Sequence, residues 1–475
     1  MILGPTSAQQ TATLAKTGRS TLDDLFRRIV TRRPDAIALA DPPNRASFTD
    51  GAPRRLTFAQ ADRVVSAIAE RLHRLGLQTD QIVAIQMANT VDAVLTLLGI
   101  ARAGLIATPL PLLWRQPECV AALNRVGAAA LIVSNRIGSV DHCALAMNVA
   151  AEVFHIRHVG AFGSDLPDGI APFDDLYDIE PTDEPPTIPR ALNPAAHVAV
   201  ITWDVGADGL VPVARSHFEL LAAGAAIALE SRVEQNAVIL SSLALPSFGA
   251  LALSVLPWLL VGGTLALHHP FDDLAFVAQC EAEQCNVIVV PGALAPRLAD
   301  AGAFNRRDGA KTVIAAWRAP ESLADSAGWD DPAIGLIDVP VFGETALFAA
   351  RRAANGRPAP VRLGPVTAPS GTAGALQMAE LTRTEAGTIG IRGPLVPKFP
   401  LPASVDSVGQ PAFTVGGDGF VDTGYPCEVD PESREVTISG PPAGVGGGHR
   451  AGLRALAAAS AAVEAEPAVR EKARA

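Results

Sequence analysis

One stretch of the sequence combines hydroxyl, imidazole and glycine groups of the kind that take part in phosphate or acyl transfer. It reads TWDVGADGLVPVARSH, from Thr202 to His217, with Ser216 beside the histidine. Phosphate binding requires flexible glycine backbone, cationic side chains and a magnesium-binding carboxylate. The stretch contains no lysine, and Asp204 and Asp208 add negative charge to it. It is therefore poorly suited to holding a triphosphate.

Cysteine spacing gives no metal-binding pattern. Cys280 and Cys285 are separated by four residues, with no second Cys or His pair at metal-like spacing nearby. We expect no metal site and interpret the cysteines as buried or idle thiols in a reducing compartment, which favours a cytoplasmic protein. The opening residues show no signal-peptide pattern. The five cysteines are Cys119, Cys143, Cys280, Cys285 and Cys427.

The chain before this stretch alternates strand and helix patterns, which is typical of a parallel α/β sheet. Thr57 and Gln60 form a capping-box pattern, and apolar residues at helical spacing follow them up to Gly76. The expected elements are a helix over 57–76, a strand at 82–87, a helix over 91–104, a strand beginning at 105–108, a helix near 118–126, a strand at 129–134, a helix over 144–151 and a strand near 153–156.

A long stretch without charged side chains raises the question of a membrane span. No Asp, Glu, Lys or Arg occurs between Glu234 and Asp272. Pro246, Pro257 and the Gly262-Gly263 pair divide the stretch, so we expect a buried strand, helix and strand and no membrane span.

Composition and charge limit the classes of function. Apolar residues make up 49% of the 475 residues and charged residues 18%, so there is ample material for a core. The net charge of −11 argues against nucleic acid as a partner, because phosphate binding favours a basic face. A chain of this length is expected to divide into two to four packed units.

The sequence changes texture at several points, which suggests domain boundaries. An acidic, proline-rich linker over 178–190 separates two α/β units, and short strands broken by Gly and Pro begin near 358. The expected units are a flexible tail over 1–19, a first α/β subdomain over 20–190, a second over 191–352, a small β-rich subdomain over 353–440 and a vestigial C-terminal segment over 441–475.

Several segments, in order along the chain, resemble the adenylate-forming superfamily, which includes the acyl-CoA synthetases and other AMP-dependent ligases. The first runs from LTFAQADRVV to LLGIARAGLIATPL, and LLVGGTL, GTIGIRGPLV and DGFVDTGYPCEVD follow. The resemblance implies two stacked, doubly wound α/β subdomains and a small β-rich, barrel-like subdomain. It also implies a two-step reaction, in which a carboxylate attacks ATP to form an acyl-adenylate and a thiol such as coenzyme A displaces AMP.

The family's phosphate loop is rich in Gly, Thr and Ser and ends in Pro-Lys-Gly, followed by Ser-His or Thr-His. Thr202, Ser216 and His217 fit this pattern, whereas Trp203 stands within the Ser-Gly-Thr-Thr centre. Arg215 is a candidate substitute for the missing lysine, but we expect it to be a solvated surface charge.

The adenine platform of the family is a Gly-Gly-Ala-Pro turn, whose missing side chains leave a slot for the base. Ala319 and Pro320 match this turn, while Trp317 and Arg318 replace the two glycines. Because a Trp needs far more room than a Gly, we expect Trp317 to fill the slot or to turn outward. The alternative, that Trp317 packs elsewhere and the slot survives, stays open.

The next family motif is Tyr-Gly-x-Thr-Glu, whose Thr contacts the α-phosphate and whose Glu helps to hold magnesium. Phe342, Gly343 and Thr345 match it, and Ala346 replaces the glutamate. We interpret Glu344, within the motif, as an ordinary surface residue.

Two further motifs are altered. The family's ribose-binding Asp follows a Thr-Gly pair, but Thr423 and Gly424 are followed by Tyr425. The hinge Gly-Arg-x-x-Asp reads Gly440-Pro441-Pro442, and two prolines would limit the domain rotation that the family uses. The resemblance therefore identifies a degenerate member that lacks most of the C-terminal domain and its lysine.

These replacements leave three hypotheses. The preferred one is a non-catalytic module that binds an acyl or aryl carboxylate or CoA ester, or a protein partner. Phe248 and Gly249 line its acyl pocket, which we expect to be open. The alternative is an active acyl-activating ligase that uses a C-terminal domain from another chain. The third is a transferase or hydrolase around His217, although a histidine here is more often a packing residue. No cofactor is expected, although the family uses ATP, Mg and CoA.

Overall fold

The structure is a computed structural model of the 475-residue chain. It describes residues 18–179, 193–206, 209–304, 309–329, 331, 333–398, 401, 413 and 415–442. Residues 1–17 of the tail expected over 1–19, most of the linker and residues 443–475 of the expected C-terminal segment lie outside the described residues.

The first sheet has seven strands, and its central strands run parallel. Its order is β11-β10-β4-β3-β5-β8-β9, with β3, β4, β5 and β8 parallel and β10–β11 an antiparallel hairpin. Helices α4 (Phe58–Arg74), α5 (Val91–Arg102), α6 (Gln116–Val126) and α7 (His142–Glu152) accompany it. The strands are β3 (Ile82–Gln86), β4 (Ile106–Pro109), β5 (Ala130–Ser134), β8 (His158–Phe162), β9 (Ala171–Pro172), β10 (Val198–Gly206) and β11 (Gly209–Ser216).

The second sheet has nine strands, and its centre is also parallel. Its order is β17-β16-β15-β14-β12-β13-β1-β2, with β18 paired to β16. The strands are β1 (Ile37–Ala40), β2 (Arg55–Thr57), β12 (Val238–Ser241), β13 (Thr264–Leu267), β14 (Val287–Pro291), β15 (Thr312–Trp317), β16 (Gly335–Phe342), β17 (Ala346–Leu347) and β18 (Ala350–Arg351).

A smaller antiparallel sheet follows in the chain. Its five strands are β19 (Gly364–Ala368), β20 (Leu376–Arg383), β21 (Thr388–Arg392), β22 (Val421–Val429) and β23 (Val436–Ile438), paired in chain order. A two-stranded ribbon, β6 (Arg136–Ile137) and β7 (Val140–Asp141), lies apart from the three sheets.

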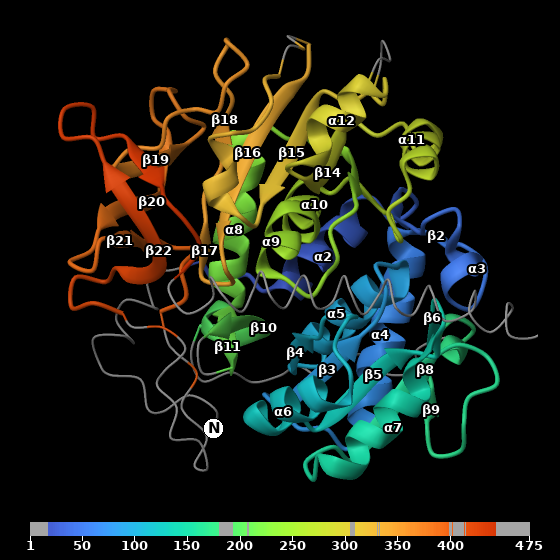
Figure 1. Ribbon diagram of the computed structural model, residues 1–475. Coiled ribbons are helices and arrows are strands. Elements are labelled where there is room, and N and C mark those ends of the chain that lie inside the picture. Colours follow the sequence, from blue (N-terminus) through green and yellow to red (C-terminus); the bar gives the residue numbers. More distant parts are fainter. Residues whose placement is uncertain are drawn as a thin grey trace, which may run out of the picture.

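Helices cover both faces of the two large sheets, so that each is doubly wound (Figure 1). Helices α6 and α7 pack on the outer face of the first sheet, and α11 (Asp273–Ala282) and α12 (Leu294–Asp300) on the outer face of the second. One large core lies between the sheets. It includes residues of α4, α5, α2 (Leu22–Arg32), α8 (His217–Glu230) and α10 (Leu256–Val261). The expected fold of two stacked α/β units with a β-rich unit is confirmed.

Local sequence explains most elements of the first sheet. Thr57 caps α4, and the reciprocal bond from Gln60 completes the predicted capping box. The expected helices and parallel strands over 57–134 are present within a few residues. One expectation is wrong: the strand placed near 153–156 begins at His158, because Val153 ends α7 and a turn follows it.

The uncharged stretch folds as a buried strand, helix and strand. Strand β12 leads through α9 (Phe248–Ala250) and the π-helix η3 (Leu251–Val255) into α10, and β13 follows. Gly263 allows the chain to pass close to Ala237, since a Cβ there would lie 1.8 Å from the Ala237 carbonyl oxygen. Among the described residues, no helix is long and apolar enough to cross a membrane.

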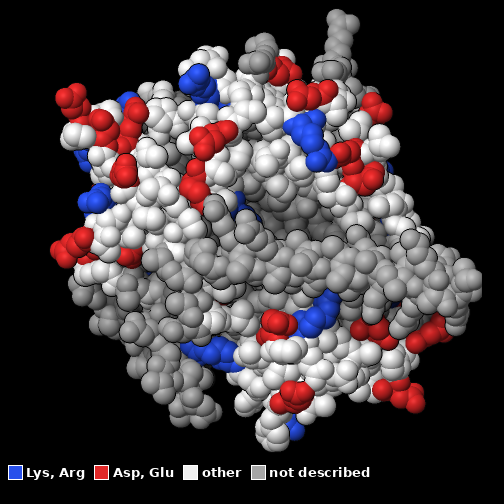
Figure 2. All heavy atoms as spheres, viewed as in Figure 1, with Lys and Arg blue, Asp and Glu red and all other residues white. Residues whose placement is uncertain are grey.

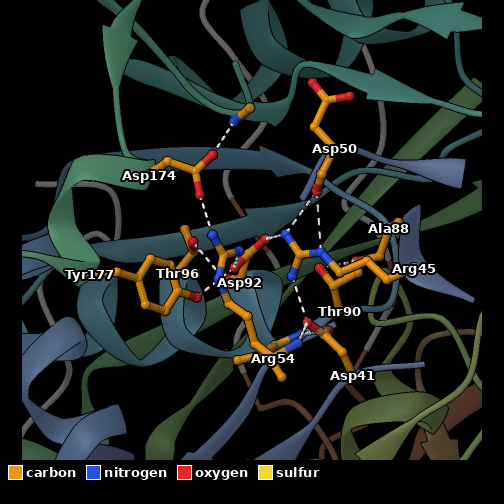
Figure 3. A network of polar contacts seen from close by, with 12 residues as sticks. Asp41, Arg45, Asp50, Arg54, Ala88, Thr90, Asp92, Thr96, Asp174 and Tyr177 are labelled. Atoms are coloured by element: carbon orange, nitrogen blue, oxygen red, sulfur yellow. Dashed lines mark hydrogen bonds and ion pairs between the residues drawn. The ribbon is translucent and has the colours of Figure 1, made fainter. Parts of the chain in front are cut away.

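A buried ionic network connects the segment after β1 with helix α5 of the first sheet (Figure 3). Asp92, on α5, accepts hydrogen bonds from Arg45 of the short helix α3 (Arg45–Phe48), from Arg54 and from the Tyr177 hydroxyl. Arg45 also pairs with Asp41 at 2.6 Å, and Arg54 pairs with Asp174 of the 3₁₀ helix η1 (Asp174–Tyr177). The network fixes the segment after β1 on the first sheet's helices.

Strand pairing does not follow the boundary expected at residue 190. Strands β1 and β2, from the first expected unit, pair in the second sheet, whereas β10 and β11, from the second expected unit, pair in the first. Which strands pair in a sheet depends on residues that are far apart in the sequence. A change of composition along the chain does not indicate such pairing. The five cysteines are buried and free, as expected.

Candidate functional site

The stretch that resembles the phosphate loop forms the hairpin β10–β11. Trp203 lies on the hairpin face that packs in the outer core of the first sheet. Its Nε1 donates a 2.8 Å hydrogen bond to the Thr108 hydroxyl, and its ring meets Trp114 edge-on. Trp203 thus anchors the hairpin to the sheet and points away from the core between the sheets.

Asp204, the next residue, contacts the turn after β16. Its carboxylate accepts a 2.8 Å hydrogen bond from the Glu344 backbone N–H. Gly343 has a φ of +54°, and a Cβ on it would lie 2.1 Å from Asp204 Oδ2. Glycine is therefore required at this position, both for the left-handed backbone and for the close approach of the carboxylate.

Glu344 is fully buried, so its interpretation as a surface residue is wrong. One of its carboxylate oxygens accepts from the Phe248 backbone N–H at the start of α9, and the other accepts from Arg318 at 3.1 Å. Burial raises the pKa of Glu344, while Arg318 opposes the rise. The residue links three segments that are far apart in the sequence.

Arg215 is also buried, so the expectation of a solvated surface charge is wrong. Its guanidinium carbon lies 3.5 Å from the centre of the Phe248 ring. Its Nη2 donates to the carbonyl oxygens of Glu344 and Thr345. Burial lowers the pKa of Arg215 to about 10, although Glu344, Glu219 and Asp204 oppose this change. Among the described residues, its Nε and Nη1 have no hydrogen-bond partner.

Trp317 packs on the outer face of the second sheet. The side chain is 7% exposed, belongs to the core beneath α11 and α12, and does not turn outward. Its Nε1 donates to Asp338 at 2.8 Å, and its ring lies so close to Gly292 that a Cβ there would approach within 2.3 Å. The next side chain, that of Arg318, does not join this core and donates a hydrogen bond to Glu344. Ala319 and Pro320 follow at the start of the 3₁₀ helix η4 (Pro320–Leu323).

The turn that resembles the family's Tyr-Gly-x-Thr-Glu motif connects β16 to β17. Phe342 and Ala346 are paired across this hairpin and both are buried. Ala346 carries no side-chain oxygen that could bind a cation. The Thr345 backbone carbonyl oxygen is one of the two acceptors of Arg215.

The segment Thr423-Gly424-Tyr425 on β22 also reaches this turn. The Tyr425 hydroxyl accepts a 3.3 Å hydrogen bond from the Gly343 backbone N–H, and its ring meets Phe342 edge-on. Burial raises the pKa of Tyr425 to about 12. Thr423 donates to the Ile389 carbonyl oxygen and holds neighbouring strands together. Pro441 lies beyond β23 and forms no described contact with the turn.

Ser216 and His217 begin helix α8. Ser216 is its N-cap and forms a capping box with Glu219. The His217 ring accepts a hydrogen bond from the Leu22 backbone N–H and connects α8 to α2. Thr202 is buried on β10, and its hydroxyl has no partner among the described residues.

The acyl-pocket candidates lie beside Arg215. Phe248 is fully buried, and a Cβ on Gly249 would meet Val341 at an ordinary 3.5 Å. A nearby apolar cavity has a volume of about 10 Å³, which is room for one water molecule. Its lining is Ile85, Met87, Ala93, Leu97, Pro109, Leu245 and Pro246.

The structure thus brings together the hairpin, the turn after β16, the start of α9 and strand β22. The contacts between these segments are made by Asp204, Arg215, Glu344 and Tyr425. Arg318 binds Glu344 from the side that faces solvent. The sequence interpretation missed the roles of Arg215 and Glu344. The available signal was their position inside two family motifs. On the face shown in Figure 2, Lys and Arg lie among Asp and Glu without a continuous basic patch.

Comparisons with known proteins show which family and which solved structures the chain is similar to. A family model described as an AMP-binding enzyme matches residues 26–334. The chain is 31% identical over 198 residues to 2-hydroxy-7-methoxy-5-methyl-1-naphthoate–CoA ligase of Streptomyces carzinostaticus, covering 39% of this chain and 33% of that protein. It is 27% identical over 234 residues to feruloyl-CoA synthase of an Amycolatopsis species, covering 49% and 43%. The matches span less than half of these relatives.

Solved structures share the fold. The apo structure of MbtA from Mycobacterium smegmatis has a TM-score of 0.68 at 19% identity and covers 93% of this chain and 80% of that chain. The anthranilate CoA ligase AuaEII, in complex with anthranoyl-AMP, has a TM-score of 0.68 at 16% identity and covers 89% and 77%. Because the family model matches most of its length, the chain belongs to the AMP-binding enzyme family.

Proposed function

We propose that this chain is a non-catalytic member of its family, which binds an acyl or aryl ligand, or a protein partner, without using ATP. The observation that carries the proposal is the contact between Asp204 and the Glu344 backbone N–H. The resemblance places the ATP phosphates between these two segments.

Donors that could meet phosphate oxygens are already engaged within the chain. The Glu344 amide donates to Asp204, and the Gly343 amide donates to the Tyr425 hydroxyl. A nucleotide would have to displace both acceptors, and the amides would gain no additional hydrogen bond by the exchange. Exchanging one hydrogen bond for another leaves little net free energy.

Electrostatics also disfavours a nucleotide. Two like charges 4 Å apart repel by about 4 kcal/mol at an effective dielectric constant of ~20. The Asp204 carboxylate would oppose the phosphates in this way, and the described part of the hairpin contains no lysine. Ala346 offers no ligand to magnesium. The residues at this site therefore do not fit a magnesium-bound nucleotide.

The relatives support an acid or its thioester as the ligand class. The names of two of them describe CoA ligases of naphthoate and feruloyl groups. We extend to this chain only the binding of such an acyl or aryl group.

Calorimetry with ATP and magnesium tests the proposal. We expect no heat of binding from this protein, because Asp204 and Tyr425 occupy the turn amides. An active acyl-CoA ligase titrated in parallel shows that binding of this ATP can be detected in this buffer. Micromolar affinity for ATP would contradict the proposal.

The alternative, an active ligase with a C-terminal domain supplied by another chain, makes a separate prediction. Carboxylate-dependent ATP–pyrophosphate exchange would then rise when a stand-alone C-terminal domain is added. We expect background exchange in its presence, and also after Ala346→Glu or Leu210→Lys, because groups that act in one transition state do not restore activity singly. Exchange above a heat-killed control in any of these samples would favour the ligase.

A further inference from the structure

The end of helix α11 brings two cysteines together on the outer face of the second sheet (Figure 1). Gln284, just after the helix, has a left-handed backbone with a φ of +56°, and its N–H donates to the Glu281 carbonyl oxygen at 3.2 Å. The N–H of Cys285 donates to the Cys280 carbonyl oxygen at 3.0 Å. These two hydrogen bonds define a Schellman motif, in which the side chains of the outer two residues often contact each other. At the end of α11, both of these residues are cysteines.

The two thiols are close enough to form a disulfide. They are hydrogen-bonded to each other, and both are free. Because the Cys285 nitrogen and the Cys280 oxygen are 3.0 Å apart, standard bond lengths place the two Cα atoms within about 7 Å of each other. Disulfides form at Cα separations of about 4.4–6.8 Å. Closing a disulfide here would therefore require little movement of the backbone.

The turn that covers the two thiols lies at the surface. Glu281, Ala282 and Gln284 are exposed. Beneath them, Cys280 is 7% exposed and Cys285 is 1% exposed. The last turn of a helix frays more readily than its middle, so local opening at this end exposes both thiols together. A small oxidant can therefore reach the pair while the sheet stays intact.

We propose that Cys280 and Cys285 are a redox-sensitive modification site, at which a peroxide converts the two thiols to an intramolecular disulfide. Cys280, as its thiolate, attacks one peroxide oxygen, the O–O bond breaks, and a sulfenic acid and water form. The sulfur of Cys285 then attacks the sulfenic sulfur, so that an S–S bond forms and a second water leaves. Each sulfur gives up one electron, and hydrogen peroxide accepts the two electrons and the two thiol protons.

The surroundings of the two thiols support this order of steps. The hydrogen bond with Cys280 and burial raise the pKa of Cys285. Cys285 therefore stays protonated, and the more exposed Cys280 meets the oxidant first. The disulfide would fix the end of α11 against the start of β14, a central strand of the second sheet. The site lies apart from the hairpin β10–β11 and the turn after β16, so it does not depend on the proposed function.

Peptide mapping of the full chain after treatment with hydrogen peroxide tests this inference. Trypsin cleaves after Arg232 and Arg297, and the peptide 233–297 contains Cys280 and Cys285 and no other cysteine. After the peroxide is removed, the protein is unfolded and its free thiols are alkylated before digestion. We expect this peptide to lose both alkylation sites, to be two hydrogen atoms lighter than its reduced, unalkylated form, and to regain both sites after dithiothreitol. The peptides that should stay alkylated contain Cys119, Cys143 and Cys427.

Serine variants distinguish a reactive pair from a reactive single thiol. Neither Cys280→Ser nor Cys285→Ser should form the disulfide. In Cys285→Ser, the reaction should stop at the sulfenic acid of Cys280, which dimedone traps. Cys427→Ser is the matched control, because Cys427 is a buried cysteine on β22, and this variant should form the disulfide as the unmodified protein does. Circular dichroism shows whether each variant folds.

Three results would overturn the inference. The first is alkylation of both cysteines after peroxide treatment of the folded protein. The second is oxidation of Cys280 to a sulfinic or sulfonic acid without a disulfide. The third is loss of the Cys119, Cys143 and Cys427 thiols at the same rate, since oxidation would then not depend on the motif. If the serine variants do not fold, mapping of the unmodified protein decides between these outcomes.

Discussion

At the scale of single residues, burial of charge distinguishes this site. Arg215, Glu219 and Glu344 are all buried. Glu219 belongs to the capping box of α8, and its carboxylate accepts from Ser216 and from the Lys398 backbone. Burial raises the pKa of Glu219, although Ser216 and Arg215 oppose the rise. The ionised carboxylate is therefore less stable in the folded chain than in the unfolded one.

A glutamate with a raised pKa makes stability depend on pH. Between its ordinary and raised pKa values the folded state binds more protons than the unfolded state, so stability falls as pH rises through this window. Glu219→Gln keeps the cap and removes the charge. We expect the stability of the variant relative to the unmodified protein to increase as pH rises from the ordinary pKa of a glutamate through the raised pKa of Glu219.

Urea unfolding at several pH values measures this difference. Glu435→Gln, at an exposed glutamate of the small sheet, is the control variant. A stability difference between Glu219→Gln and the unmodified protein that is constant with pH, or that falls as pH rises, would contradict the burial argument.

At the scale of elements, the hairpin β10–β11 and the turn after β16 contact each other through Asp204 and Gly343. The turn needs both a left-handed backbone and an open space for the Asp204 carboxylate. These two requirements can be separated, because only the second depends on Asp204.

A double-mutant cycle tests this contact. Gly343→Ala adds a Cβ that collides with Asp204 and places an L-residue at positive φ, which itself costs about 1–2 kcal/mol. In an Asp204→Ala background only the backbone cost remains. We expect a coupling energy of about 1–3 kcal/mol from unfolding midpoints. Additivity of the two substitutions within about 0.5 kcal/mol would show that the two elements are not in contact.

At the scale of the whole molecule, the network in Figure 3 connects the two large sheets. Asp92 accepts from Arg45, Arg54 and Tyr177, which come from segments before and after it in the chain. Arg45 and Asp92 are each about 2% exposed, so solvent cannot replace a lost partner.

Removing Asp92 should destabilise the whole molecule. Asp92→Ala leaves two guanidinium groups without this carboxylate, and breaking a buried pair in this way costs about 3–5 kcal/mol. The exposed pair of Arg362 and Glu435 is the control, and Glu435→Ala should cost less than about 1 kcal/mol. Guanidinium unfolding midpoints compare the two variants. Equal shifts would mean that the network contributes no more than a surface pair.

Local patterns in the sequence were sufficient for the elements over 57–134 and for the family. The capping box at Thr57, the helical spacing of apolar residues before Gly76 and the strand at Ile82 each depend on neighbours within a few positions. Such signals appear in the sequence directly because hydrogen bonds and side-chain periodicity are local. The ordered motifs then predicted a parallel α/β core, which the structure confirms.

Only the tertiary structure decided which groups the charged residues of these motifs contact. Arg215 meets Phe248, Glu344 and Thr345, which lie between 33 and 130 positions away in the chain. The exchange of β1–β2 and β10–β11 between the sheets is equally non-local. A charged residue type predicts exposure, and only distant partners make its burial stable. For that reason the sequence alone indicated a surface arginine where the structure has a buried one.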